Sequence, residues 1–206
     1  MTRINLRVPF SQKEEVRALG ARWDATLRTW YVPEHVDPGG FARWRPAEAT
    51  CNVRSASYFI ATATRECWRC LAASRVHGFI VPPGHEVLSV EDDPKDDHWE
   101  ASGEPSLLSY IDWLPDAVVA RIQSVTQRYR IEYSNTIDSF YWMNSCEHCE
   151  SKLGDNDTFN EFATGFGAIS AEQAAAIRLR LVQEPFSASV GSFSVGLDFF
   201  EAMTLA

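Results

Sequence analysis

The sequence lacks any long apolar run, because no stretch approaches the roughly 18 consecutive apolar residues that a membrane-spanning helix requires. Its first ten residues, MTRINLRVPF, also lack the apolar segment of a secretory signal peptide. We therefore expect a cytoplasmic protein with no membrane partner. The 206 residues, 45% hydrophobic and 23% charged, are typical of a globular protein with a hydrophobic core.

The motifs of common enzyme classes are also missing. The sequence contains no phosphate-binding glycine loop, nucleophile elbow or kinase signature. His77, His85 and His98 stand apart from any metal-binding pattern, and we interpret them as ordinary core or surface histidines. A run of acidic residues lacks the glycine and terminal glutamate of a calcium-binding loop, and we interpret it as a solvated loop. Its members are Asp92, Asp93, Asp96, Asp97 and Glu100. Enzyme activity is left uncertain, and a non-enzymatic role is favoured.

Positive charge is scarce and unevenly distributed. The chain has 19 Lys and Arg against 28 Asp and Glu, a net charge of −9. Residues 1–45 hold eight basic and five acidic side chains, a net +3, so the remainder carries −12. This excess of acid disfavours broad, non-specific binding of polyanions but is compatible with a local basic face on the first segment.

Residues 1–45 are predicted to form a small strand, helix and hairpin module. Apolar and polar residues alternate in INLRVPF, which is typical of a half-buried strand that ends at Pro9. Ser11 and Glu14 match a capping box for a short helix, and Gly20 matches its left-handed C-terminal cap. The stretch ARWDATLRTWYV then predicts two short aromatic strands around a turn.

Residues 46–206 are predicted to form a second, acidic domain. Strand patterns lie at 57–63, twice within 76–90, and at 129–136 and 139–144. Helix patterns lie at 114–129 and at 171–183, the latter after a Ser170–Gln173 capping box, and 91–105 is expected to be an exposed loop. Short turns between the strands predict an α+β fold with antiparallel pairing.

Four of the five cysteines form two pairs that match metal-binding knuckles, Cys67-Trp68-Arg69-Cys70 and Cys146-Glu147-His148-Cys149. Two residues between cysteines allow both thiolates to face one tetrahedral ion, and two such knuckles predict a structural four-sulfur zinc site. The 75 residues between the pairs exceed the usual separation of about 15–20. Strands predicted before both knuckles still permit them to meet.

Other interpretations of the cysteines are disulfides, a redox pair or chance. A cytoplasmic chain keeps its thiols reduced, and neither pair begins a helix in a βαβ setting, as a thioredoxin-type motif would. His148 is an alternative ligand to one of the cysteines. A four-cysteine site leaves no open coordination position, so it would stabilise the fold and not catalyse. Cys51 is interpreted as a small buried residue.

The stretch from Ala18 to Pro33 has two competing interpretations. Its aromatic side chains can fill the core of a module too small to close with aliphatic residues alone. Alternatively, aromatic and basic side chains can form a stacking and phosphate-contacting face for single-stranded nucleic acid. The residues predicted for that face are Arg7, Arg22, Trp23, Arg28, Trp30 and Tyr31.

Residues 4–33, INLRVPFSQKEEVRALGARWDATLRTWYVP, resemble a small bacterial domain of unknown function that occurs alone and attached to plasmid-transfer primases. The resemblance rests on the VPF strand end, the charged helix, LGARWD and WYVP. More distantly, the same pattern is similar to the HARP module of annealing helicases. The resemblance implies a DNA-metabolism context, with matching positions at Arg22, Trp23, Asp24, Trp30 and Tyr31. Residues from about 50 onward resemble zinc-ribbon-containing bacterial proteins in general.

Three functional hypotheses follow. In the first, a non-enzymatic, zinc-stabilised protein contacts single-stranded or branched DNA through its N-terminal module. In the second, a protein-interaction or immunity-type protein uses its acidic surface against a basic partner such as a nuclease toxin. The third, ranked last, is a hydrolase or nuclease whose acidic loop holds a metal.

Overall fold

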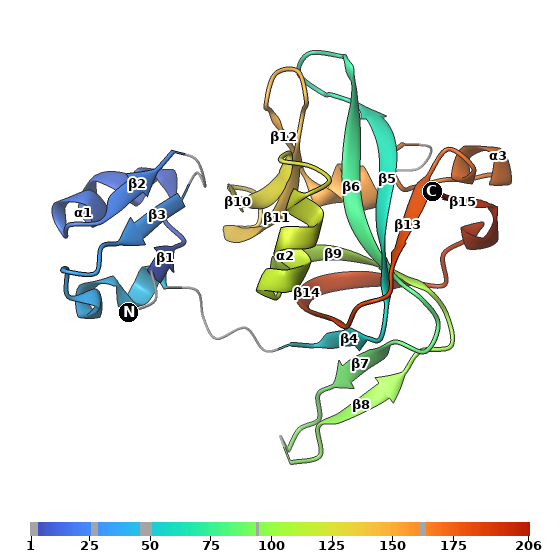
Figure 1. The fold of residues 1–206 in the computed structure, drawn as a ribbon, viewed down its shortest axis with the longest axis horizontal. Coiled ribbons are helices and arrows are strands. Elements are labelled where there is room, and N and C mark those ends of the chain that lie inside the picture. The colour runs from blue at the N-terminus through green and yellow to red at the C-terminus, as the bar shows by residue number, and fades with distance from the viewer. Residues whose placement is uncertain (1–3, 26–28, 46–50, 94, 161–163) are drawn as a thin grey trace. The chain divides into compact units, whose positions relative to one another are not determined.

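The computed structural model of the chain describes residues 4–25, 29–45, 51–93, 95–160 and 164–206. These residues fall into two compact units (Figure 1). The first comprises residues 1–49 with the short segment 135–140, and the second comprises residues 50–134 and 141–206. The predicted boundary after residue 45 borders residues 46–50, which lie outside the described residues, and it stays a prediction.

The first unit contains a three-stranded antiparallel sheet in the order β1-β3-β2. Its elements are β1 (Ile4–Leu6), the 3-10 helix η1 (Phe10–Gln12), α1 (Lys13–Ala18), β2 (Arg22–Asp24), β3 (Thr29–Val32) and the 3-10 helix η2 (Pro38–Trp44). The predicted strand, helix and hairpin are therefore present. The capping box predicted at Ser11 is wrong, because Ser11 lies within η1 and no side chain caps the start of α1. Gly20 has a φ of 100°, as the predicted left-handed cap requires.

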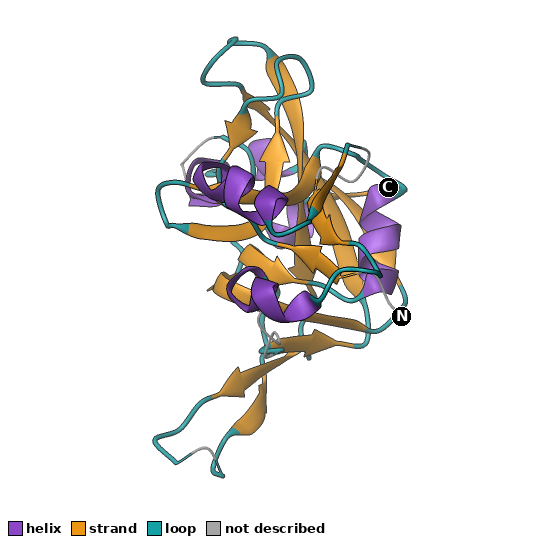
Figure 2. Ribbon diagram, turned by 90° about the vertical axis from the view of Figure 1, so that its left-hand side faces the viewer, coloured by secondary structure: helices purple, strands orange, loops and turns teal. Residues whose placement is uncertain are grey.

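The second unit is built on a nine-stranded sheet in the order β15-β13-β5-β6-β9-β14-β4-β7-β8. Its strands are β4 (Val53–Ser55), β5 (Tyr58–Glu66), β6 (Ala73–Val81), β7 (Glu86–Ser89), β8 (His98–Ala101), β9 (Ser106–Trp113), β13 (Arg178–Val182), β14 (Phe186–Val195) and β15 (Thr204–Leu205). The registers described within this sheet are antiparallel except that of β13 with β15. Strands dominate the fold and helices are few (Figure 2), which confirms the α+β class.

A smaller sheet and several short helices complete the second unit. They are β10 (Tyr129–Ser134), β11 (Ser139–Ser145), β12 (Lys152–Leu153), α2 (Asp116–Gln123), the π-helix η3 (Asn156–Asn160), α3 (Ala171–Ala174) and the 3-10 helix η4 (Phe200–Ala202). Two predictions are corrected here. The expected loop 91–105 contains β8, and the expected helix 171–183 ends after one turn as α3, with residues 178–182 forming β13. The alternating pattern Arg178–Val182 is that of a strand.

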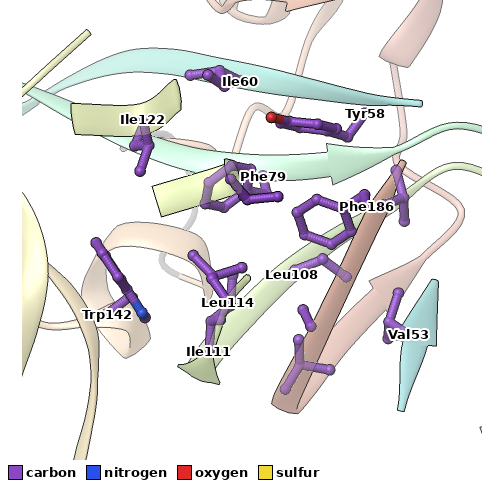
Figure 3. Close-up of a cluster of buried hydrophobic side chains, with 14 of the residues drawn as sticks. Val53, Tyr58, Ile60, Phe79, Leu108, Ile111, Leu114, Ile122, Trp142 and Phe186 are labelled. Carbon is purple, nitrogen blue, oxygen red and sulfur yellow. The ribbon is translucent and has the colours of Figure 1, made fainter. Parts of the chain in front are cut away.

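Hydrophobic clusters cover both faces of the central strands. On one face, Tyr58 and Ile60 of β5 pack with Phe79, Leu108 and Phe186 (Figure 3). Phe59 and Ala61, which alternate with them, belong to the cluster on the opposite face. Burial on both faces explains the apolar runs at residues 58–61 of β5 and 78–81 of β6. Among the described residues, no helix is long enough and apolar enough to cross a membrane.

Candidate metal centre and candidate nucleic-acid surface

Four cysteine side chains gather at the ends of the β5–β6 and β11–β12 connections, and they are Cys67, Cys70, Cys146 and Cys149. All four Sγ atoms lie within 4.8 Å of one another. The Sγ atoms of Cys67 and Cys149 are 3.7 Å apart, as are those of Cys70 and Cys146. A tetrahedral ion with metal–sulfur bonds of about 2.3 Å requires sulfur–sulfur edges of about 3.8 Å. The cluster therefore has the dimensions of a site that can hold a metal ion.

The two knuckles repeat the same local hydrogen-bond pattern. The Cys67 amide donates to the Ala72 carbonyl, while the Leu71 amide donates to the Cys67 carbonyl. The Cys146 amide donates to Ser151, and Glu150 donates to Cys146, at the same sequence offsets. The residue after each second cysteine adopts a left-handed conformation, with φ of 60° at Leu71 and 58° at Glu150. The repeat aims both thiols of each knuckle in one direction.

Contacts between β6 and the second knuckle bring the two pairs together despite the long separation in sequence. The Arg75 guanidinium donates two hydrogen bonds to the Glu147 carboxylate, at 2.7 and 2.9 Å. The Arg75 amide also donates to this carboxylate, at 2.9 Å, and the Glu147 amide donates to Ser74 Oγ, at 3.0 Å. The His148 ring bonds the Ala73 carbonyl at 3.0 Å. His148 is therefore occupied in this link, while all four sulfurs converge.

Asn144 supplies a second link just before the second knuckle. Its side chain accepts from the His77 amide and donates to the His77 carbonyl, both at 2.8 Å. The described pairing of β6 with β9 begins only at Phe79, so Asn144 takes the place of a neighbouring strand at His77. Both residues are buried, and burial, reinforced by Arg75, lowers the pKa of His77 to about 4. His77 is therefore a neutral core residue at neutral pH.

The environment of the thiols favours a partly ionised cluster. Hydrogen bonding with the Ser151 hydroxyl and backbone lowers the pKa of Cys149 to about 6. Burial raises the pKa of Cys146, but hydrogen bonds from the Cys149 and His148 amides outweigh it, and the pKa falls below its ordinary value. The Ala72 amide lowers the pKa of Cys70, yet burial and the neighbouring sulfurs raise it to about 12. Such a cluster binds a cation in exchange for protons.

The other candidate metal ligands do not join this cluster. Among the described residues, no second group of three or more His, Cys, Asp or Glu side chains surrounds a common point. The acidic residues between β7 and β8 therefore do not converge on one point. Cys51 is half-buried and bonds the Val53 carbonyl, whereas His85 is buried and contacts the Pro82 carbonyl.

The residues predicted for nucleic-acid contact divide between the two faces of the small sheet. Trp23 pairs with Trp30, and Trp30 also pairs with the buried Leu6, so all three side chains share the core face. Arg22 pairs with Tyr31, so these two side chains lie on the opposite face. The single surface predicted for the set is therefore divided.

Trp30 is half-buried against the module core, and Trp23 stacks edge-on against it with a centroid distance of 5.8 Å. Half of the Trp23 surface is exposed, at 50%. Arg22 is also exposed, while Arg7 follows β1 and its amide donates to the Trp44 carbonyl. Arg28 lies outside the described residues. The core interpretation therefore holds for Trp30, and the exposed positions are Arg22 and part of Trp23.

Sequence reasoning missed the contacts that position the metal centre. Neither Asn144 nor Ser151 belongs to a recognisable motif, because their partners are distant in sequence. Leu71 and Glu150 adopt left-handed conformations, for which glycine is the usual sequence signal. Because neither residue is glycine, the repeated turn could not be predicted from the sequence. The paired Cys-x-x-Cys pattern was the one local signal available.

Comparisons with known proteins place the first unit in context. Residues 3–46 match a family described as a domain of unknown function, DUF5710. A DNA primase TraC of Escherichia coli is 37% identical over 120 residues, covering 56% of this chain and 11% of that protein. A second DNA primase TraC of Escherichia coli is 42% identical over 52 residues, covering 25% of this chain and 4% of that protein.

The resemblance to a domain of unknown function attached to primases is thereby confirmed. The chain spans about a tenth or less of the length of these relatives. The longer alignment exceeds residues 3–46, so the likeness extends into the second unit. No solved structure matches the chain significantly. The zinc-ribbon resemblance of the second unit has no matching family.

Proposed function

We propose that this chain is a non-enzymatic bacterial protein, stabilised by structural zinc, that binds single-stranded or branched DNA through its N-terminal module. The observation that carries the nucleic-acid part is the likeness of 56% of the chain to a protein named DNA primase TraC. The predicted cytoplasmic location stays a prediction.

Zinc is the metal we propose for the site formed by Cys67, Cys70, Cys146 and Cys149. Four thiolates in a tetrahedral arrangement suit zinc or an iron–sulfur cluster, and two Cys-x-x-Cys knuckles are typical of structural zinc. Cys67 and Cys146 are members of a hydrophobic cluster, so a bound ion would cross-link two connections over the core. A closed set of four sulfurs leaves no position for water or substrate, which supports a structural role.

The DNA contact we propose centres on Arg22 and Tyr31 on one face of the small sheet, with the exposed part of Trp23 offered from the opposite face. Arg22 is exposed and Trp23 offers half of its surface for stacking on an unpaired base. Arg7 and Arg28 complete the predicted basic set, and Trp30 supports Trp23 from the core. The net +3 of residues 1–45 favours a phosphate backbone, whereas the acidic remainder restrains non-specific binding.

A fluorescent single-stranded oligothymidylate, titrated with the full chain at several salt concentrations, tests the proposal. Arg22→Ala should weaken binding and reduce the slope of log affinity against log salt by about one. Arg17→Ala is the matched control, because Arg17 is exposed on α1 of the same module and pairs with Glu14. Equal affinity and equal slope for Arg22→Ala and the wild type would refute the assignment.

A second candidate function is contact with a basic protein through the hairpin β7–β8. Figure 1 shows this hairpin extending from the rest of its sheet, with β8 at the sheet edge. The acidic residues of the hairpin and its connection are Glu86, Glu91, Asp92, Asp93, Asp96, Asp97 and Glu100. Such a surface favours a cationic partner. A stable, salt-sensitive complex with a basic protein, abolished by neutralising these residues, would support this function.

A further inference from the structure

The first cysteine knuckle displays two large apolar side chains to solvent. Trp68 is 63% exposed and Leu71 is 68% exposed. Neither belongs to the hydrophobic clusters that form the cores of the two units. Leu71 also occupies a left-handed position that glycine would adopt without strain. The knuckle therefore carries exposed apolar surface that its own fold does not use.

The Trp68 indole is held in place at one edge. Its Nε1–H donates a 2.8 Å hydrogen bond to the Lys152 carbonyl, which joins the first knuckle to β12. The ring consequently keeps one orientation while most of its surface remains accessible. A fixed aromatic face loses little conformational entropy when a planar group stacks on it.

Two basic residues adjoin Trp68, Arg69 in the sequence and Lys152 through its backbone carbonyl. Arg69 is exposed and its guanidinium lies 3.5 Å from Ser151 Oγ, next to Lys152. Lys152 Nζ donates to the Tyr133 carbonyl and lies 3.8 Å from Glu132 Oε2, a carboxylate that Arg130 contacts more closely, at 2.8 Å.

The second knuckle and its turn contain two carboxylates, and both form ion pairs with arginines. Glu147 pairs with Arg75 and Glu150 pairs with Arg128. The exposed Glu66 and the cysteine thiolates limit the attraction of a phosphate chain to this end of the unit.

We propose that Trp68 is a stacking platform for an unpaired base of single-stranded nucleic acid, with Arg69 and Lys152 beside the flanking phosphates. A single exposed indole with one leucine is much smaller than the roughly 800 Å² per partner of a stable protein interface, which favours a nucleobase over a protein. The inference rests on the proposed nucleic-acid function, to which it adds a contact in the second unit. Stacking, rather than charge, supplies its affinity.

The test uses the full chain, purified with its metal, and a fluorescent 20-nucleotide oligothymidylate at low and high salt. Trp68→Ala should raise Kd between about 5-fold and 140-fold at both salt concentrations, since each stacked base contributes that much. The salt slope should not change, because no charge is removed. Trp68→Phe keeps an aromatic face and should retain most of the affinity.

Val90→Ala is the matched control, because Val90 is 72% exposed on the distant β7–β8 connection. Metal content and Tm of each variant establish that the knuckle is intact. If Trp68→Ala unfolds the knuckle, the Arg69→Ala variant decides: a weaker affinity than the wild type supports the proposal, and an unchanged affinity overturns it.

The two nucleic-acid proposals fail in different ways. Loss of affinity in Arg22→Ala with none in Trp68→Ala would overturn the stacking platform and leave the N-terminal contact standing. The reverse result would support the platform and remove the N-terminal contact. No binding by the wild-type chain at any salt overturns both. A protein complex that is lost in Trp68→Ala while DNA affinity is unchanged would assign the indole to a protein and overturn the platform.

Discussion

Exchanging the buried Asp155 for asparagine should flatten the pH dependence of stability. Asp155 follows β12, and its Oδ2 accepts a 2.7 Å hydrogen bond from the Tyr110 amide, where β9 turns through a φ of 51°. Its Oδ1 has no hydrogen-bond partner among the described residues. Burial raises the pKa of Asp155 from 3.8 to about 8, although the Tyr110 hydrogen bond opposes the shift.

The sign of the effect follows from proton linkage. The folded state holds the proton at pH values where the unfolded state has released it, so the folded state binds more protons between about pH 4 and pH 8. The contribution of Asp155 to stability is complete below about pH 4 and is lost as the pH rises through about 8. The limiting loss is about 1.4 kcal/mol per pH unit, or roughly 4 kcal/mol between pH 5 and pH 8.

Urea unfolding of the wild type and of Asp155→Asn at pH 5, 6, 7 and 8 measures the effect. The asparagine carbonyl can still accept from the Tyr110 amide, but the side chain no longer titrates. The free energy of unfolding of the variant relative to the wild type should therefore rise steadily with pH.

Asp92→Asn, an identical exchange at an exposed position, is the control and should leave the difference constant. A constant difference for Asp155→Asn as well would refute the assignment of a buried, protonated carboxyl.

Two substitutions test the contacts that join the knuckles and the core. Asn144→Ala removes both hydrogen bonds to His77 and leaves two buried backbone groups unpaired, so it should cost at least about 2 kcal/mol in urea unfolding and weaken metal retention. Unchanged stability would refute the claim that Asn144 joins β6 to the second knuckle. Gly78→Ala places a methyl group 2.7 Å from the buried Phe159 ring and should cost about 1–3 kcal/mol, whereas Gly103→Ala, with no atom within 4 Å, should be tolerated. Equal melting temperatures for the two alanine variants would contradict the packing at β6.

Sequence patterns correctly predicted the elements whose structure depends on residues close by in the sequence. The hairpin Arg22–Val32, the turn between β6 and β7, and the pairing of Val118 with Ile122 on one helix face follow from alternation, turn residues and helical spacing. The helix predicted over 171–183 was wrong. Its alanines favour a helix, but Arg178–Val182 is stabilised more by pairing with β5 in the sheet.

The candidate metal centre was predictable in its ligands but not in its construction. Two Cys-x-x-Cys pairs are a local signal, so Cys67 and Cys146 could be named from the sequence. The links that align them, through Asn144 and Arg75, connect residues 67 and 72 positions apart and leave no local pattern. For the aromatic residues of the first unit, sequence could not decide between core and surface, because strand register sets that choice.

Metal analysis of the purified full chain tests the central claim most directly. The account predicts one zinc per chain, retained by Cys51→Ser and lost by Cys67→Ser and Cys146→Ser, with a lower Tm in the two variants that lose the metal. A wild-type chain without stoichiometric metal, or Cys67→Ser and Cys146→Ser variants that match Cys51→Ser in metal content and Tm, would contradict it.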